Sequence, residues 1–334
     1  MGAMTAAQAP RLVDSLGRTI DYVRLSVTDR CDFRCRYCMP EQMRFLPRDA
    51  LLRLDELETI ASRLVARGIR RIRLTGGEPL VRGDLLSLAD MLGTLLGKGL
   101  DELTLTTNGA RLDTAARPLA AAGIRRVNVS LDTLDPDRFR TITRRDAFAA
   151  VMAGLAAADA AGLRVKINMV ALAGLNEDEI VAMAQWCGRR GYDLTLIETM
   201  PLGLVEEDRT DRFLPLSTAR ARLESRFTLV PSLHRTGGPA RYVEAPELGI
   251  RIGFISPLSH NFCASCNRVR VTADGTLFMC LGQSDSVDLK GALRAGGAAG
   301  LDDALDAALA AKPRAHDFRI GTAAVARHMN LTGG

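Results

Sequence analysis

Short apolar runs recur through the first two thirds of the chain, separated by stretches in which apolar residues return at helical spacing. In residues 54–65 the apolar positions repeat every three or four residues, Asp55 and Glu56 open the segment and Gly68 closes it. Residues 177–190 show the same pattern. This alternation predicts β/α units and a parallel sheet, because parallel strands need long crossovers. The six predicted strands cover residues 22–28, 71–75, 102–107, 126–132, 165–172 and 193–199.

Glycines and polar residues gather where these strands end. Ligands of parallel β/α folds bind at the carboxyl ends of the strands, so one rim of the sheet is expected to carry a small-molecule site. The strand ends lead into Asp29-Arg30-Cys31, Gly76-Gly77-Glu78-Pro79, Asn108-Gly109, Ser130-Leu131-Asp132, Asn168-Met169 and Glu198-Thr199-Met200.

The rhythm of strands and helices ends near residue 205. Residues 206–245 are charged and contain a Gly-Gly-Pro loop signal. Short strand-like runs follow from residue 248, and the second predicts a hairpin that turns at Asp274-Gly275. An Ala-rich helix is predicted over residues 301–311.

Composition sets broad limits on the protein. A chain of 334 residues that is 47% hydrophobic suits one large domain with a smaller appendage. No stretch approaches the length needed to cross a bilayer, and the start lacks the basic residues and apolar run of a signal peptide. We therefore expect a cytoplasmic protein with no membrane partner. Seven cysteines, an odd number, fit a reducing compartment better than a disulfide framework.

The charge pattern bears on possible ligands. The formal net charge is +5, and Arg outnumbers Lys by 40 to 4. Aromatic residues make up only 4% and no Lys/Arg run is interleaved with them, so no nucleic-acid partner is predicted. A solvated basic face or a polyphosphate ligand accounts for the charge.

Three cysteines follow the first predicted strand in the spacing Cys-x3-Cys-x2-Cys, at Cys31, Cys35 and Cys38. A [4Fe-4S] cluster normally takes four cysteines, and structural zinc also takes four ligands. Three thiolates therefore leave one metal position open for an exogenous ligand. A zinc knuckle that borrows a distant fourth ligand is the alternative.

A second trio, Cys263, Cys266 and Cys280, has the spacing Cys-x2-Cys-x13-Cys. A zinc site here would need a histidine or a carboxylate to close it. His260 is poorly placed for this role, because only two residues separate it from Cys263. We therefore expect a second open [4Fe-4S] cluster. The remaining cysteine, Cys187, is expected to be a buried inert thiol.

Basic residues near the second trio predict an anionic substrate. Arg268 and Arg270 occupy alternate positions, so they project from one face of a strand and suit phosphate recognition. Arg24 and Arg73 are inward-facing candidates on the first two strands. Lys166 is the one lysine in an otherwise apolar strand, and its alternative role is a salt bridge to a carboxylate such as Glu198.

The run VTDRCDFRCRYCMP resembles the signature of the radical S-adenosylmethionine (SAM) enzymes. Three features narrow the resemblance to the GTP 3′,8-cyclase family, over residues 18–334: the second trio, the CNRVR run that begins at Cys266, and the terminal Gly333-Gly334. The resemblance implies an α/β fold, a partial (β/α)6 TIM-like barrel of the radical SAM type with a smaller C-terminal Fe-S domain. We expect an N-terminal extension over residues 1–17, the barrel over 18–245 and the C-terminal domain over 246–334.

By this resemblance the trios hold two [4Fe-4S] clusters, and the first cluster binds SAM. The glycines of the Gly76-Gly77-Glu78-Pro79 run let the backbone approach the amino group of SAM. Ser130 is placed for a ribose hydroxyl, or it closes a strand corner. The expected SAM-binding residues are Tyr37, Gly77, Ser130 and Met200.

GTP is expected between the clusters, with its guanine on the second. The residues expected near its phosphates and ribose are Arg24, Arg73, Thr106, Lys166, Arg268, Val269 and Arg270. The residues expected to act in catalysis are Arg268, Arg270, Lys166, Gly333 and Gly334, the last two reaching into the active site as the end of the chain.

The implied reaction is a radical one. A 5′-deoxyadenosyl radical would take the 3′ hydrogen of GTP, and the ribose radical would attack C8 of guanine. An electron and a proton would complete (8S)-3′,8-cyclo-7,8-dihydroguanosine 5′-triphosphate, in the first step of molybdenum cofactor biosynthesis. The implied partners are a low-potential electron donor, a downstream cyclic pyranopterin monophosphate synthase and a second copy of the chain in a homodimer.

One position departs from the family pattern: many members carry an arginine where this sixth strand has Thr195. One phosphate or radical-site contact is therefore missing or comes from another arginine. Two rival interpretations remain: another radical SAM enzyme with an auxiliary cluster, such as a peptide-modifying maturase, and a non-catalytic zinc protein with a basic nucleic-acid surface.

Overall fold

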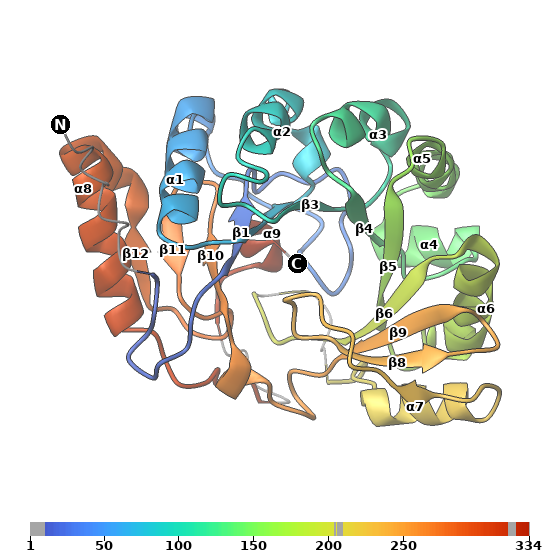
Figure 1. The fold of residues 1–334 in the computed structure, drawn as a ribbon. Coiled ribbons are helices and arrows are strands. Elements are labelled where there is room, and N and C mark those ends of the chain that lie inside the picture. The colour runs from blue at the N-terminus through green and yellow to red at the C-terminus, as the bar shows by residue number, and fades with distance from the viewer. Residues whose placement is uncertain (1–10, 204, 206–209, 320–324, 334) are drawn as a thin grey trace.

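The computed structural model describes residues 11–203, 205, 210–319 and 325–333. Six parallel strands form an arc, with helices along its outer side (Figure 1). The strands are β1 (Tyr22–Ser26), β2 (Arg71–Thr75), β3 (Glu102–Thr107), β4 (Arg126–Ser130), β5 (Arg164–Ala171) and β6 (Asp193–Glu198). The α-helices between and after them are α1 (Leu54–Ala66), α2 (Leu85–Gly93), α3 (Leu112–Ala121), α4 (Pro136–Thr143), α5 (Phe148–Ala160) and α6 (Ile180–Arg190). Short 3₁₀ turns cover Arg48–Ala50, Pro79–Val81, Glu177–Glu179 and Cys263–Ser265.

All six predicted strands and both predicted helices of the barrel are confirmed. The core lies between the sheet and the helices, because each helix buries one apolar stripe. In α1 this stripe includes Leu57, Ile60 and Leu64, each no more than 1% exposed. In α5, a Cβ at Gly154 would stand 2.1 Å from the carbonyl oxygen of Gly109, so only glycine lets this helix lie against the loop after β3.

Strands from the C-terminal region extend both edges of the barrel sheet. The strand order is β12-β11-β10-β1-β2-β3-β4-β5-β6-β9-β8-β7. The edge beside β1 adds β10 (Arg268–Val271), β11 (Thr276–Phe278) and β12 (Ser286–Asp288), and the edge beside β6 adds β9 (Ile250–Ile255), β8 (Arg241–Ala245) and β7 (Val230–Pro231). The predicted hairpin is confirmed, since β10 and β11 are antiparallel and Gly275 between them has a φ of 89°.

The sheet continues across the domain boundary that we predicted at residue 245, because β8 and β9 pair on either side of it. The charged segment before that boundary also holds α7 (Leu216–Glu224), which the sequence pattern did not reveal. This helix is short and buries only Leu216, Ala219 and Leu223, so its apolar stripe is hard to detect.

Two further helices follow the C-terminal strands. Helix α8 (Leu289–Ala310) contains the predicted Ala-rich helix, starts earlier than expected and bends at Gly297, whose φ is 57°. Helix α9 (Met329–Thr332) lies in the middle of the arc (Figure 1). Among the helices of the described residues, none has the length and apolar character needed to span a membrane.

Candidate functional site

A first cavity lies at the carboxyl ends of the barrel strands, where the sequence predicted a ligand site. Cys31, Cys35 and Cys38 form part of its wall. Each of the six barrel strands, or the loop that follows it, also contributes. The lining includes Thr75, Gly76, Gly77, Thr106, Thr107, Asn108, Ser130, Asp132, Asn168, Val170, Ile197, Glu198, Thr199 and Met200, together with Tyr37 from the cysteine loop.

The cysteine loop and the glycine run after β2 are held directly together. The backbone N–H of Gly77 donates to the carbonyl of Thr28 at 2.9 Å, and that of Glu78 donates to the carbonyl of Arg30 at 2.8 Å. A Cβ at Gly77 would stand 2.4 Å from the Arg30 oxygen. Glycine is therefore required for this approach, which brings the glycine run and the thiols into the wall of one cavity.

Two buried carboxylates, Asp132 and Glu198, line this cavity, and a third, Glu78, follows Gly77 of its wall. Glu78 accepts hydrogen bonds from the backbone of Asn108 at 2.6 Å and from Thr107 Oγ1 at 2.8 Å, and burial raises its pKa to about 7. Asp132 accepts from Tyr37 Oη at 2.7 Å, and burial raises its pKa to about 6. No lysine or arginine among the described residues lines the cavity. Its charge therefore suits a cationic ligand, such as a molecule with a sulfonium and an ammonium group.

A second cavity, next to the first, is lined by Cys263, Cys266 and Cys280. Its charge is the opposite, because five cationic side chains line it and no carboxylate of the described residues does. Asn168, Ile197, Met200 and Met329 line both cavities. The five cations are Arg24, Arg73, Lys166, Arg268 and Arg270.

Strand pairing explains why these cations face one space. Arg24 lies opposite Arg270 on one neighbouring strand and opposite Arg73 on the other, so the three side chains share a face of the sheet. Burial lowers the pKa of Arg24 and Arg73, and lowers that of Arg270 to about 10. The pKa of Lys166 is also lowered well below its usual value by burial.

Several of these groups lack a partner in the protein. Within the described part of the chain, the Nε atoms of Arg73, Arg268 and Arg270 are buried without a hydrogen-bond acceptor. Buried donors without a partner are costly, and buried charges are normally paired. The second cavity therefore suits a ligand with several negative charges.

The second cysteine trio is supported by two basic residues that sequence reasoning missed. Lys312, 4% exposed, donates to the carbonyl of Arg268 at 3.1 Å and reaches Cys266 Sγ at 3.8 Å. Arg18 donates to the carbonyl of Cys263 at 2.9 Å and to that of Pro313 at 2.7 Å. The rarity of lysine in this chain was the one available signal for Lys312.

The thiols of both trios are free, as a metal cluster requires. Burial raises the pKa of Cys31 and Cys35, so cluster binding there would release protons. Burial also acts on Cys266, but Lys312 and Arg268 offset it and hold the pKa of that thiol below its usual value. The donor set at each cavity is three thiols with space beside them, which fits a [4Fe-4S] cluster with one iron open.

The zinc alternatives can be compared with the same geometry. His316 lines the second cavity beside the cysteines. Among the described residues, however, no three His, Cys, Asp or Glu side chains are grouped closely enough to hold one metal ion. A four-iron cluster does not need that grouping, because each thiolate binds a different iron at its own corner.

The structure brings most of the predicted site residues together. Tyr37, Gly77, Ser130 and Met200 line the first cavity, as does Thr106, which we expected at the substrate. Val269 lines neither cavity, and its side chain packs in the core.

The predicted C-terminal residues are only partly described. Gly333 lines the second cavity, whereas Gly334 lies outside the described residues. Cys187 is fully buried in α6, as expected of an inert thiol.

The alternative role suggested for Lys166 is wrong. Glu198 instead accepts hydrogen bonds from the backbones of Leu258 and Ser259, at 3.1 and 3.2 Å. Lys166 donates to the hydroxyl of Tyr242 at 2.8 Å. Among the described residues no carboxylate forms an ion pair with Lys166, and Glu198 binds a loop that the sequence pattern could not place.

The fold belongs to a known class. The model of the radical SAM superfamily matches residues 25–187, and that described as Molybdenum Cofactor Synthesis C matches residues 192–318. The crystal structure of SuiB from Streptococcus suis bound to S-adenosylmethionine is similar at a TM-score of 0.61 and 14% identity. The likeness covers 87% of this chain and 64% of that longer one, and it shows the fold alone. The fold is that of a radical SAM enzyme.

The sequence relatives are more specific. A GTP 3′,8-cyclase of Erythrobacter litoralis (strain HTCC2594) is 58% identical over 98% of this chain and 99% of its own length. A GTP 3′,8-cyclase of Rhizobium etli (strain CIAT 652) is 56% identical over 98% of this chain and 96% of its own. The chain belongs to the GTP 3′,8-cyclase family.

Proposed function

We propose that this chain converts GTP to (8S)-3′,8-cyclo-7,8-dihydroguanosine 5′-triphosphate, the first step of molybdenum cofactor biosynthesis, with the residue roles given below. One observation carries the assignment of roles. Two cavities, each with three free thiols, share part of their walls and have opposite charge. That arrangement suits a cationic cofactor and a polyanionic substrate held side by side.

The first cavity would hold SAM and one of the two clusters. Cys31, Cys35 and Cys38 would bind one [4Fe-4S] cluster, and the second trio would bind another. When bound, the first cluster and SAM supply a primary carbon radical at the 5′ position. The protein's part is to orient this group and to exclude water, because such a radical is quenched by any nearby hydrogen donor. Gly77 would approach the amino acid end of SAM, and Ser130 its ribose.

The second cavity would hold GTP. Arg24, Arg73 and Arg270 would bind the phosphates from one side, and Lys166 would do so from β5. Guanidinium groups match phosphate oxygens in pairs, so several arginines on one face fix both position and register. Arg268 stands beside the second cysteine trio, and we assign it to the ribose or guanine end.

Two other predicted residues receive adjusted roles. Thr106 lines the cavity of the first trio, so we assign it to the reacting end of the ligands, where cofactor and substrate meet. Val269 would contribute only through its backbone, because its side chain is buried in the core.

The C-terminal segment would complete the active site. Met329 lines both cavities, and Asn330 Nδ2 donates to the carbonyl of Asp29 at 2.7 Å, next to the first cysteine loop. Deleting Gly333 and Gly334 is expected to lower turnover by at least about tenfold while both clusters still load, because the missing residues only close the cavity. Iron content and product formation would be measured together, and unchanged turnover would contradict the role of the tail.

The decisive experiment is anaerobic incubation of the iron-reconstituted protein with GTP, SAM and a low-potential reductant, followed by mass analysis. The expected product has the mass of GTP and altered retention, and the 3′ hydrogen of GTP is found in 5′-deoxyadenosine. Cleavage of SAM with GTP untouched would favour another radical SAM enzyme, such as a peptide-modifying maturase. No cleavage by the cluster-loaded protein would overturn the radical assignment.

The biological setting is also part of the proposal. The chain would receive electrons from a low-potential donor, pass its product to a cyclic pyranopterin monophosphate synthase and act in the cytoplasm as a homodimer. Co-purification, size-exclusion chromatography and light scattering test these points.

A further inference from the structure

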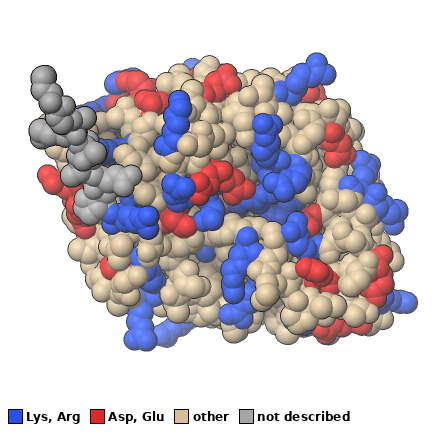
Figure 2. Space-filling view, viewed as in Figure 1, with Lys and Arg blue, Asp and Glu red and all other residues tan. Residues whose placement is uncertain are grey.

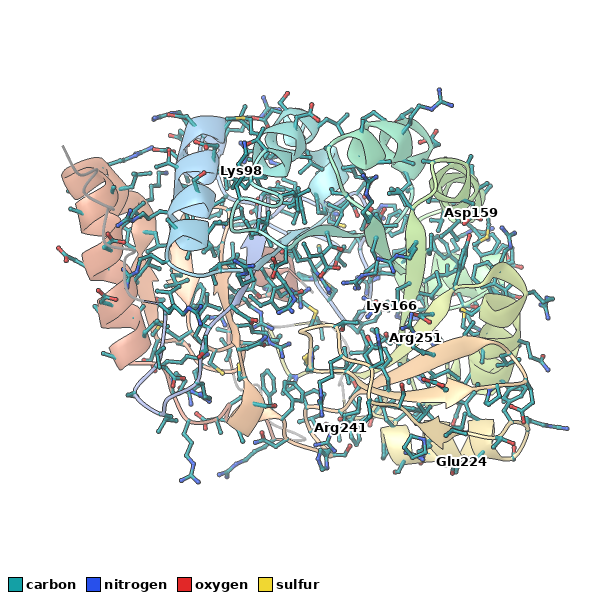
Figure 3. The ribbon with its side chains drawn as sticks, in the orientation of Figure 1. Lys98, Asp159, Lys166, Glu224, Arg241 and Arg251 are labelled. Atoms are coloured by element: carbon teal, nitrogen blue, oxygen red, sulfur yellow. The ribbon has the colours of Figure 1, made fainter. Side chains whose placement is uncertain are left out.

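Tyr242 contacts a lysine of the substrate cavity, and no sequence motif indicates this contact. This residue lies on β8, outside the six barrel strands, and is 5% exposed. Its hydroxyl accepts a hydrogen bond from Lys166 Nζ at 2.8 Å, and its ring centroid lies 5.4 Å from that nitrogen. Lys166 points into the middle of the arc, whereas Asp159 lies at its outer rim (Figure 3).

Lys166 depends on this contact. It is 5% exposed, and no carboxylate of the described residues forms an ion pair with it. The hydroxyl of Tyr242 is the one hydrogen-bond partner recorded for its ammonium group within the described structure. A buried flexible lysine that has a single neutral partner is held in place by that partner, and its charge is left for a ligand.

Small residues make the room that the tyrosine ring occupies. Tyr242 pairs with Gly253 across β8 and β9, and Gly253 pairs with Thr195 on β6. A Cβ at Gly253 would stand 2.9 Å from Tyr242 Cε1 and 3.2 Å from Thr195 Oγ1. Any side chain larger than hydrogen at Gly253 would therefore push the ring out of its place.

The ring is fixed from its other side as well. The His234 ring packs edge-on against it, with centroids 4.9 Å apart, and His234 Nδ1 lies 2.9 Å from a nitrogen of Arg251. Arg251 is itself paired with Asp193 at 2.8 Å. Thr236, which lines the same cavity, lies 3.2 Å from the tyrosine hydroxyl. The tyrosine is thus held by β9 and by the loop before β8.

We propose that Tyr242 is a positioning residue for substrate binding: it holds the ammonium group of Lys166 toward the phosphates of the anionic substrate. The inference rests on the proposed function, and it names the part of the site that orients the one lysine among the four arginines. The hydroxyl acts through Lys166, and the cation of Lys166 contacts the phosphate.

The test is a double-mutant cycle in the cluster-loaded protein without reductant, so that binding is measured in the absence of turnover. Tyr242→Phe removes the hydroxyl and keeps the ring. GTP binding by calorimetry is expected to weaken about tenfold, as for loss of a hydrogen bond to a charged group. Lys166→Met is expected to weaken it at least as much. The double variant should bind GTP no worse than Lys166→Met alone, because the hydroxyl has no effect once the ammonium is gone.

Three controls make the result specific. Tyr192→Phe removes another buried hydroxyl, which donates to Asp159 at 2.6 Å away from both cavities, and should leave GTP binding unchanged. SAM binding should be the same in all variants, which excludes a general loss of structure. Gly253→Ala, which displaces the ring, should weaken GTP binding as Tyr242→Phe does.

The outcomes separate this inference from the proposed function. Wild-type affinity in Tyr242→Phe, or additive losses in the double variant, would overturn the role of Tyr242. If the unaltered protein does not bind GTP, the proposed function fails, and inorganic tripolyphosphate is titrated into the same four proteins. The positioning role would still be supported if Tyr242→Phe binds tripolyphosphate about tenfold more weakly than the unaltered protein, and the double variant binds it as well as Lys166→Met does. If Tyr242→Phe binds tripolyphosphate as tightly as the unaltered protein, the positioning role is overturned.

Discussion

Two buried lysine side chains place positive charge at the second cavity and at its cysteine trio. The chain uses arginine for most of its cations, yet lysines occupy two of the most enclosed cationic positions, Lys166 and Lys312. A compact ammonium fits among backbone carbonyls where a planar guanidinium does not. At Lys312 it satisfies carbonyls that flank the second cysteine trio and adds a positive charge beside the thiols.

Lys312→Met is expected to remove about half of the bound iron, because the carbonyls of Arg268 and Met279 lose their donor and the second trio loses a stabilising charge. Iron analysis and electron paramagnetic resonance of the reduced protein measure the loss. Lys290→Met is the matched control, since Lys290 also donates to a backbone carbonyl, that of Ala50 at 2.7 Å, but lies away from both trios. Full iron content in Lys312→Met would contradict the prediction.

Glu78 should make stability depend on pH. Burial raises its pKa from 4.5 to about 7, so the folded state holds this proton more tightly than the unfolded state does. The free energy of unfolding therefore carries a penalty that develops as pH rises from 4.5 to 7, worth about 3 kcal/mol. Glu78→Gln cannot ionise and lacks this penalty.

The measurement is urea denaturation of both proteins at several pH values under anaerobic conditions. The stability of the unaltered protein relative to Glu78→Gln should fall by about 3 kcal/mol across that range. Taking the difference removes the effects of carboxylates that do not interact with Glu78. Parallel pH profiles would show that Glu78 is not the cause.

At the scale of elements, α8 is attached to the barrel by buried charge as well as by apolar packing. Arg67, at the end of α1, is 2% exposed and pairs with Asp302 at 3.0 Å and with Asp306. Glu56 at the other end of α1 pairs with Arg294 at 2.8 Å. Lys312 follows α8 directly, so the docking of this helix also places the ammonium beside the second trio.

Asp302→Asn is expected to lower the free energy of unfolding by about 2 kcal/mol, because the buried guanidinium of Arg67 loses part of its counter-charge. Asp55→Asn breaks the exposed Arg53–Asp55 pair and should change stability by less than about 1 kcal/mol. Denaturation of the three proteins in urea gives the comparison. Equal effects of the two substitutions would show that apolar packing alone docks α8.

At the scale of the whole molecule, the charges are sorted by cavity rather than spread over the surface. Figure 2 shows basic and acidic side chains mixed on the outer face. Inside, carboxylates without cations line one cavity, and cations without carboxylates line the other, within the described residues. The separation keeps opposite charges of the protein from neutralising one another and leaves both for the ligands.

The two binding functions should therefore be separable. Arg73→Gln is expected to weaken GTP binding by about tenfold or more and to leave SAM binding unchanged, because it removes a charged phosphate contact from one cavity only. Ser130→Ala should weaken SAM binding by a smaller factor and leave GTP binding unchanged. Calorimetry with each ligand alone tests both. A loss of both affinities in either variant would show that the cavities are not independent.

The sequence by itself determined the six barrel strands, the helices over residues 54–65 and 177–190, and the rim on which polar strand ends meet. These features depend on local periodicity and on the rule that parallel strands end on one side. It also supplied both cysteine trios and the paired arginines of β10, because spacing along one loop or strand fixes which side chains share a face.

Only the tertiary structure decided how distant segments meet. It placed β9 and β10 on opposite edges of the barrel sheet and Thr106 in the first cavity. It also showed that Glu198 binds the loop at Leu258 and does not pair with Lys166. Lys166 lies 76 residues from its partner Tyr242, and Cys263 lies 245 residues from its partner Arg18. No periodicity links residues so far apart, since such contacts depend on strand order and on the space that small residues such as Gly253 leave open.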